Sequence, residues 1–370
     1  MSYPSSNVFE TSVNGTSIAG FRNRMINGDM RIDQANAGAS VSITNTATYG
    51  VDMWKGFGTA AAGVFTIQQS STTPPAGFTN FTRITTTTAD ASPAAGSLYE
   101  FFTNIEGQNL QDLQWGLSTA KTITISFQVR SSLTGAFSGC IVNSAAARSF
   151  PFSFSIISAN VWQTMTITIP GDQSGTWLTT NGIGLQLRFD LGSGSNFKGA
   201  AGNWSSNNFI GVTSAVGVVA TNAATLDITG VQLELGPIAS SFEIRDYQSE
   251  LKRCQRYYAT SIEPGATISN FTTLNSSGVG GCFGYAPASN SDLLTNVIYP
   301  TTMRAAPNIT VYSGANRTAG AVRDMTTGSD VSGFPTGGTS GNPNGLMYIA
   351  GNTLTAQRGY GFHYVADARL

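Results

Sequence analysis

Hydrophobic and polar residues alternate with a period of two along much of the chain. In the stretch 121–129 (KTITISFQV), an apolar residue stands at every second position from Ile123 to Val129, with Thr, Ser and Gln between them. Successive side chains of a strand point to opposite faces, so this pattern predicts a strand with one face in a core. Four further stretches are predicted as strands: 25–32, 162–169, 182–189 and 224–235.

Turn residues separate the predicted strands, for example at Pro74-Pro75 and Pro170-Gly171. Proline presets φ and glycine accepts a positive φ, so both favour turns. Many short antiparallel strands at this spacing predict an all-β fold, with a jelly-roll β-sandwich over residues 21–245. Residues 1–20 are polar and lack a period, and we predict that they form an extended N-terminal arm.

The period changes once, in residues 246–258 (DYQSELKRCQRYY). Four residues have the spacing i, i+4, i+7 and i+11 that one helix face requires: Tyr247, Leu251, Cys254 and Tyr258. We predict a short helix here that links two domains. A helix of this length is marginal alone, so we expect its apolar face to pack on the chain's own domains or on further copies of the chain.

Residues 259–370 return to short β-like stretches and predict a C-terminal β-sandwich-like domain. Within it, the stretch 329–344 (SDVSGFPTGGTSGNPN) is predicted as an exposed loop. Loops on rigid β scaffolds often carry binding residues. Phe334, as an apolar patch, and Asn342 and Asn344, as hydrogen-bonding amides, are therefore candidates for glycan contact; a loop without a ligand is the alternative.

Two tryptophans are candidates for the same chemistry. Trp177 and Trp204 stand among turn residues, in SGTWLTTNG and AAGNWSSNN. An indole ring offers a flat apolar surface that matches the C–H face of a sugar. Packing within the fold is the alternative, because Trp is usually buried. Trp54 and Trp162 lie inside strand patterns and are expected in the core.

Charge is scarce in this chain of 370 residues: 19 Lys+Arg face 20 Asp+Glu, for a net charge of -1, and charged residues make up 11%. A nucleic-acid binder needs a surplus of Lys and Arg, so we expect no nucleic-acid partner. No stretch approaches the roughly 18 apolar residues of a membrane span, and the N-terminus lacks the basic and apolar regions of a secretory signal. We therefore expect synthesis in a cytoplasm without membrane insertion.

The residues also argue against catalysis and cofactors. The one histidine, His363, has no neighbouring nucleophile motif in the sequence. Cys140, Cys254 and Cys282 are too far apart for a zinc pattern, and no Walker loop is present. Two routes stay open, a carboxylate pair acting on a sugar and a loop-bound calcium ion. Asp52 and its neighbours are interpreted as turn or cap residues.

Several stretches resemble the structural proteins of tailed bacteriophages, in the tail-fibre and receptor-binding group. The most specific is ITGVQLELGPIASSFEIRDYQSELKRCQRYY at 228–258. RNRMINGDMRIDQ (22–34) with YGVDMW (49–54), YPTTMRAAPNITVY (299–312) and YVADARL (364–370) agree with it in order. The family commonly closes with an acidic residue, where this chain has Arg369.

The resemblance implies a carbohydrate-binding-like jelly roll in a virion component without a cofactor. It also implies a homotrimer. The N-terminal arm is a candidate for attachment to other virion proteins, and a loose terminus is the alternative. The expected function is that of a tail fibre or receptor-binding adhesin that contacts host-surface polysaccharide; the alternative is a non-binding structural component such as a capsid-decorating, fibre or baseplate protein. A phage structural protein needs no signal peptide, because it assembles in the host cytoplasm and reaches the outside on the virion.

Overall fold

The chain folds into two compact units. The computed structural model describes residues 12–13, 16–17, 22–59, 63–271, 273, 281–339, 342–351 and 353–370. Unit 1 consists of the described residues within 1–30, 42–48 and 56–244, and unit 2 of those within 31–41, 49–55 and 245–370. The domain boundaries predicted at 21–245 and 259–370 differ from these limits mainly in the two short N-terminal stretches, which belong to unit 2.

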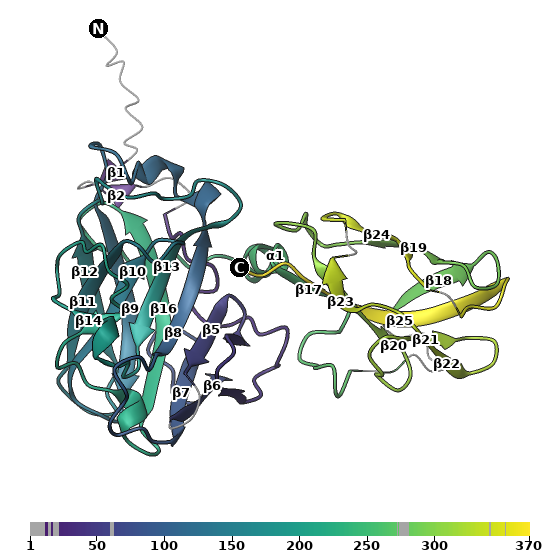
Figure 1. The fold of residues 1–370 in the computed structure, drawn as a ribbon, viewed down its shortest axis with the longest axis horizontal. Coiled ribbons are helices and arrows are strands. Elements are labelled where there is room, and N and C mark those ends of the chain that lie inside the picture. The colour runs from purple at the N-terminus through teal and green to yellow at the C-terminus, as the bar shows by residue number, and fades with distance from the viewer. Residues whose placement is uncertain are drawn as a thin grey trace, which may run out of the picture. The chain divides into compact units, whose positions relative to one another are not determined.

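Two six-stranded sheets build the β-sandwich, most of whose residues belong to unit 1 (Figure 1). The first sheet has the order β12 (Gln163–Ile169), β9 (Ile123–Ser131), β16 (Thr225–Leu235), β7 (Phe81–Thr88), β6 (Val64–Ser70), β3 (Val41–Ile43). The second has the order β11 (Ser149–Ile156), β10 (Gly135–Val142), β13 (Ile183–Asp190), β8 (Tyr99–Glu106), β5 (Trp54–Gly58), β4 (Thr48–Val51).

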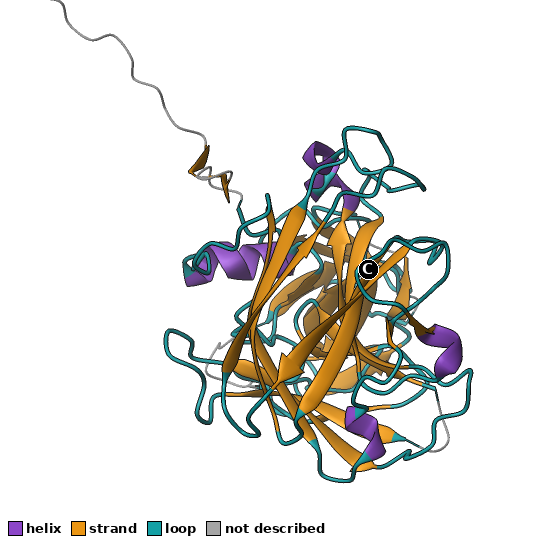
Figure 2. Ribbon diagram, turned by 90° about the vertical axis from the view of Figure 1, so that its left-hand side faces the viewer, coloured by secondary structure: helices purple, strands orange, loops and turns teal. Residues whose placement is uncertain are grey.

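Phenylalanine rings join the inner faces of these two sheets. The ring of Phe127 on β9 lies 5.1 Å from that of Phe154 on β11 and 5.2 Å from that of Phe189 on β13, centroid to centroid. The apolar positions of β9 from Ile123 to Val129 are at most 1% exposed. The predicted all-β fold with a jelly-roll sandwich is confirmed, and strands dominate the view in Figure 2.

Smaller elements complete unit 1. They are β1 (Ser12–Val13), β2 (Thr16–Ser17), β14 (Lys198–Gly199), β15 (Gly211–Val212) and the 3-10 helices η1 (Gly107–Asn109), η2 (Gln111–Leu113), η3 (Ser195–Phe197) and η4 (Val218–Ala220). Of the predicted arm, the structure describes only β1 and β2, which pair antiparallel; its other residues lie outside the described part.

The strand predicted at 25–32 is wrong. This stretch forms turns instead, and Asn27 and Met30 have positive φ angles of 54° and 58°, which no strand accommodates. Met25 and Met30 are nevertheless buried, with exposures of 1% and 0%. Apolar content alone therefore predicted burial correctly and the backbone conformation incorrectly.

The helix α1 (Tyr247–Gln255) begins as predicted and ends earlier. The carboxylate of Asp246 caps it by accepting a 2.9 Å hydrogen bond from the Ser249 N–H. Tyr258 lies beyond the helix, in strand β17 (Tyr258–Thr260), which pairs with β25 (Arg358–Asp367). Of the four predicted packing residues, Cys254 and Tyr258 are buried; Leu251 is half-buried and Tyr247 is exposed.

Unit 2 is built on one nine-stranded sheet, with its larger core cluster over one face and a smaller one, which includes Phe271 and Val365, over the other. Besides β17 and β25 it contains β18 (Cys282–Ala286), β19 (Leu293–Ile298), β20 (Asn308–Ser313), β21 (Ala321–Asp324), β22 (Ser329–Ser332), β23 (Thr336–Thr339) and β24 (Gly345–Ile349). The stretch 329–344, predicted as an exposed loop, supplies β22 and β23. The long strand β25 is hydrogen-bonded to β17, β18, β20 and β21.

Asp52 is the most strongly perturbed acid of unit 2. Its Oδ1 accepts a 3.0 Å hydrogen bond from the Gln34 N–H and its Oδ2 a 2.6 Å bond from Gln34 Nε2. Burial disfavours the charged carboxylate and raises the pKa of Asp52 to about 7. The neighbouring Asp33 is a turn residue, as predicted, and accepts from the N–H groups of Asn36 and Gly38.

We expect unit 2 to lose stability as the pH rises from 5 to 7. The unfolded Asp52 has already lost its proton at these pH values, whereas the folded one keeps it up to about pH 7, so raising the pH favours the unfolded state. The expected loss is about 2 kcal/mol. Chemical denaturation at each pH measures it, with Asp52→Asn as the control that flattens the slope; an unchanged slope in that variant would assign the effect to another group.

Candidate functional site

The outer face of the first sheet carries rows of uncharged polar side chains. Thr164 of β12, Gln128 of β9 and Thr229 of β16 stand in one row of paired residues. Thr166 and Ser126 belong to the next row. Gln128 Nε2 donates a 2.8 Å hydrogen bond to Thr164 Oγ1. Because strand side chains alternate, the apolar residues of β9 and β12 face the core, and the polar residues between them place hydroxyls and amides on the outer face.

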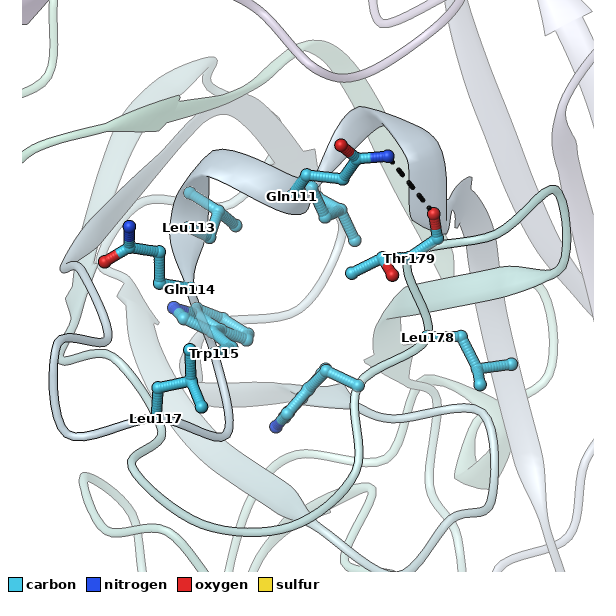
Figure 3. A pocket seen from close by; sticks show the side chains of 9 residues that line it. Gln111, Leu113, Gln114, Trp115, Leu117, Leu178 and Thr179 are labelled. Atoms are coloured by element: carbon cyan, nitrogen blue, oxygen red, sulfur yellow. Dashed lines mark hydrogen bonds between the residues drawn. The ribbon is translucent and has the colours of Figure 1, made fainter.

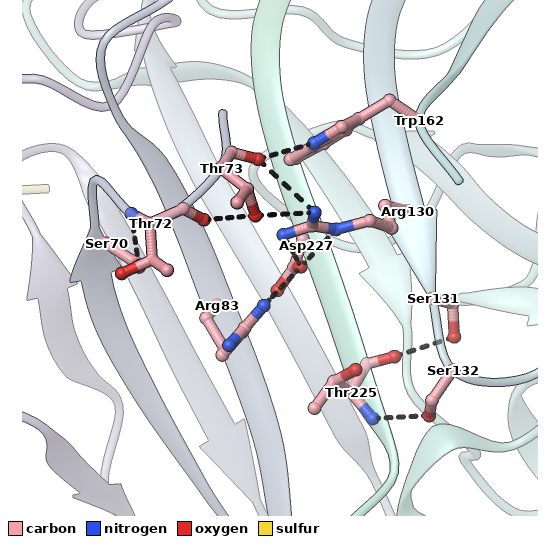
Figure 4. Close-up of polar contacts among 10 residues, drawn as sticks. All are labelled: Ser70, Thr72, Thr73, Arg83, Arg130, Ser131, Ser132, Trp162, Thr225 and Asp227. Atoms are coloured by element: carbon pink, nitrogen blue, oxygen red, sulfur yellow. Dashed lines mark hydrogen bonds and ion pairs between the residues drawn. The ribbon is translucent and has the colours of Figure 1, made fainter. Parts of the chain in front are cut away.

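The outer face of the first sheet also carries a cluster of charged residues around the buried carboxylate of Asp227 (Figure 4). Asp227 is 1% exposed and binds two arginines from the strands on either side of β16. Its Oδ1 accepts a 2.8 Å bond from Arg83 Nε, and its Oδ2 accepts a 2.8 Å bond from Arg130 Nε. The Arg130 guanidinium lies 4.6 Å from the ring centroid of Trp162, whose Nε1 donates to the Thr73 carbonyl.

Trp162 corrects a sequence prediction. We expected Trp162 in the core, but it is half-buried on the outer face of the sheet. Trp54 is fully buried, as predicted. The signal was present in the sequence: Trp162 has the same parity as Thr164 and Thr166, which are exposed. The cation–π contact with Arg130 makes that outward position favourable for an aromatic ring.

A groove of about 450 Å³ opens on this face. One side consists of the hydroxyls and amide of Ser126, Gln128, Thr164 and Thr166. The other side comes from loops and carries two phenyl rings, those of Phe78 and Phe242, which meet edge to face with centroids 5.1 Å apart, beside Ser240 and Ser241. Among the described residues that line the groove, none is charged.

Glycine allows the rings to approach the floor of the groove. Gly230 interrupts β16 with a φ of 62°, and a Cβ at this position would lie 2.6 Å from the Phe78 ring. The pairing of β16 with β9 shifts between Thr229 and Gln232, as in a β-bulge. The bulge therefore makes room for a ring above the sheet and shapes the groove.

A second feature of unit 1 is a cluster of three tryptophans, 115, 177 and 204. The ring centroids of Trp115 and Trp177 are 4.6 Å apart, and both rings pack edge to face on Trp204. Every indole N–H is used internally: those of Trp115 and Trp204 donate to the carbonyls of Lys121 and Pro170. Trp177 Nε1 donates to the carboxylate of Asp172, which also binds Arg148.

The cluster borders a small apolar pocket of about 130 Å³ (Figure 3). Trp115 and Trp177 line it together with leucines such as Leu113 and Leu178. Gln111 Nε2 points across to the Thr179 carbonyl at 3.3 Å. The pocket is smaller than the roughly 300–1,000 Å³ of a drug-sized ligand site. The structure thus brings the two predicted tryptophans together, and glycan contact through them stays a prediction.

The candidates in unit 2 are placed differently from expectation. Phe334 is 6% exposed and packs in the core, so the predicted apolar surface patch is wrong. Its ring fills the space beside Gly351, where a Cβ would lie 2.8 Å from it. Asn342 and Asn344 are exposed, but their amide oxygens accept from the Asn344 N–H and the Thr302 hydroxyl, respectively. Glycan contact by these two stays a prediction.

His363 is fully buried beside Ser261. Its Nδ1 lies 3.1 Å from Ser261 Oγ, and its ring lies 4.3 Å from that of Phe271. Burial lowers the pKa of His363 by disfavouring the charged imidazolium.

The three cysteines, predicted not to form a zinc pattern, are free thiols. Within the described ranges, no three His, Cys, Asp or Glu side chains gather as metal ligands, and no helix is long and apolar enough to cross a membrane.

Comparisons with known proteins give structural likenesses only. No protein-family model matches the chain, and no curated protein matches it. The enzymatically active domain of bacteriophage CBA120 tailspike protein 4 is similar with a TM-score of 0.30 and 10% identity, over 58% of this chain and 21% of that one. The chain thus spans about a fifth of that domain.

Two smaller proteins are similar over nearly their whole length. A putative sugar-binding protein from Bacteroides thetaiotaomicron has a TM-score of 0.32 and 13% identity, over 58% of this chain and 100% of that one. The family 11 carbohydrate-binding module of a Clostridium thermocellum cellulase has a TM-score of 0.27 and 12% identity, over 51% and 92%. These values are low, so the chemistry of the site rests on its own residues.

Proposed function

We propose that this chain is a virion tail fibre or receptor-binding adhesin that binds a neutral host-surface glycan in the groove of unit 1. One observation carries the binding: the groove sets two phenyl rings opposite rows of hydroxyls and amides, and its described lining holds no charge. Sugars have the same two aspects, apolar C–H faces and a rim of hydroxyls. An acidic polysaccharide would find no cation among those lining residues.

Each contact in the groove is expected to be weak, so binding to a cell would need several copies of the chain. A net hydrogen bond contributes about 1 kcal/mol and an exposed ring a similar amount. A single groove then binds weakly, and several copies on one particle retain a cell by acting together. The proposal of a homotrimeric fibre attached by its N-terminal arm fits this requirement; its support is the resemblance of the stretches at 22–54, 228–258, 299–312 and 364–370. The proposed location is the virion.

The test removes polar groups from the wall of the groove. In the double variant Thr166→Val and Gln128→Ala, we expect adsorption of fluorescent full-length protein to host cells, and to purified neutral surface glycan, to fall at least tenfold, since two hydrogen bonds are lost. The matched control is Thr88→Val, which removes an exposed strand hydroxyl outside the groove lining. Its adsorption should equal that of the wild type.

The same experiment addresses the competing function. If the wild-type protein adsorbs to neither cells nor glycan, the groove is not a receptor site and the non-binding structural role takes its place. If adsorption survives the double variant with the fold intact, glycan binding moves to the predicted tryptophan cluster, and Trp177→Ala becomes the variant that must lose it.

A further inference from the structure

Unit 2 exposes an apolar surface on one part of its sheet, where β18, β19 and β24 lie side by side (Figure 1). Six large side chains, each 46–78% exposed, form this open face: Phe283, Tyr285, Leu294, Ile298, Met347 and Tyr348. The strand register places Tyr285, Leu294 and Tyr348 side by side, because Tyr285 pairs with Leu294 and Leu294 with Tyr348; the pairing of β19 with β24 shifts at Met347, which is exposed next to Tyr348. The surface is therefore one patch and not scattered single residues.

The opposite face of the same three strands packs against the core of unit 2. Ala286, Leu293 and Leu346 belong to the core of unit 2. Elsewhere on the outer side, Phe271 covers β25 by packing on His363. The described residues thus cover part of the sheet's outer side and leave the six side chains of the open face exposed. Large contiguous apolar patches are rare on monomers and mark interaction surfaces.

We propose that the open face is where copies of this chain associate with one another, an inference that rests on the homo-oligomer of the proposed function. Its size fits: at roughly 200 Å² per large side chain, the exposed area of the six residues is about 700 Å². A standard specific interface buries about 800 Å² on each partner. β24 also ends the order of the sheet's main path, so the patch reaches a sheet edge that a second chain can approach.

The composition of the open face selects this partner over others. The three strands (CFGYA, LLTNVI and GLMYI) contain no charged residue, so a charged partner finds no counter-charge on them. Leu294, Ile298 and Met347 add apolar side chains to the aromatic rings, and Asn296 is the exposed amide of β19 among them, so the surface is mainly apolar. A second apolar surface of the same kind satisfies the patch, and every copy of the chain supplies one.

A hollow beside the open face can receive a side chain of a second copy of the chain. It has a volume of about 370 Å³ and is bordered by Phe283 and Ile298 of the open face, with Thr295 and Asn296 at its polar side. An apolar side chain of a second copy can enter it and bury more surface than a flat contact would. Side chains held in such pockets dominate the energetics of many interfaces.

The test places charge at the two most exposed positions. Ile298 and Met347 are 77% and 78% exposed, so the double variant Ile298→Lys and Met347→Lys should fold normally. We expect the full-length wild type to sediment as an oligomer at micromolar concentration and the variant's dissociation constant to rise at least about 30-fold. The matched control is Ile157→Lys in unit 1, where Ile157 is 80% exposed; it should leave the oligomer unchanged.

Three results would overturn the proposal. These are a monomeric wild type at micromolar concentration, an oligomer that survives both lysines at an unchanged melting temperature, and a variant that keeps its mass but loses adsorption to glycan. The last would make the open face a glycan surface. Variants of the groove at Gln128 and Thr166 should not change the mass, so this proposal and the proposed function can fail separately.

Discussion

Replacing Asp227 with alanine is expected to lower the free energy of unfolding of unit 1 by about 3 kcal/mol. The carboxylate is 1% exposed and is the shared partner of Arg83 and Arg130. Without it, two guanidinium groups face each other across β16, and Arg130, 11% exposed, keeps its charge without the acid beside it. Removing one partner of a buried pair costs more than the pair itself contributes. Thermal and chemical denaturation measure the loss, which should appear as a fall of about 6–12 °C in melting temperature.

Arg83→Ala is the control for this prediction. Arg83 is 35% exposed, and Asp227 keeps Arg130 when it is removed. The expected cost is about 1 kcal/mol or less, because Arg83 is partly solvated and Asp227 keeps its other cation. An Asp227→Ala variant as stable as the wild type would show that the arginines find other partners.

Replacing Asp172 with alanine is expected to cost a similar amount, about 3 kcal/mol, and to loosen the tryptophan cluster. This carboxylate is 1% exposed and accepts from Arg148 Nε at 2.9 Å and from Trp177 Nε1 at 3.0 Å. Losing it leaves the Arg148 guanidinium, 18% exposed, and the indole N–H of Trp177 without this acceptor. Trp177 should become more mobile and its fluorescence should shift to longer wavelength.

Ser174→Ala is the matched control, since the Ser174 hydroxyl lies 3.4 Å from Asp172 Oδ1 and contributes little. It should leave both stability and emission unchanged. If Asp172→Ala keeps the wild-type emission spectrum while stability falls, the cluster is held by ring packing alone. If neither quantity changes, the ion pair with Arg148 makes no net contribution to the fold.

The strand residues of the groove could be predicted from the sequence, whereas its two phenylalanines could not. The period of two in 121–129 and 162–169 determined which residues of β9 and β12 face outward, so Gln128, Thr164 and Thr166 were placed correctly. Phe78 and Phe242 are 164 positions apart in loops without a period. Their meeting depends on how β16 is inserted between β9 and β7, which is a long-range contact that no local pattern records.

By itself, the sequence determined the all-β class, the inward and outward faces of the long strands and the start of the helix at Asp246. These follow from side-chain alternation and capping, which act between near neighbours. Only the tertiary structure decided that three distant tryptophans meet, that Phe334 is buried, and that β18, β19 and β24 leave an apolar face open. Burial of a residue outside a clear period depends on what the rest of the chain places over it, and that is set by packing across the whole unit.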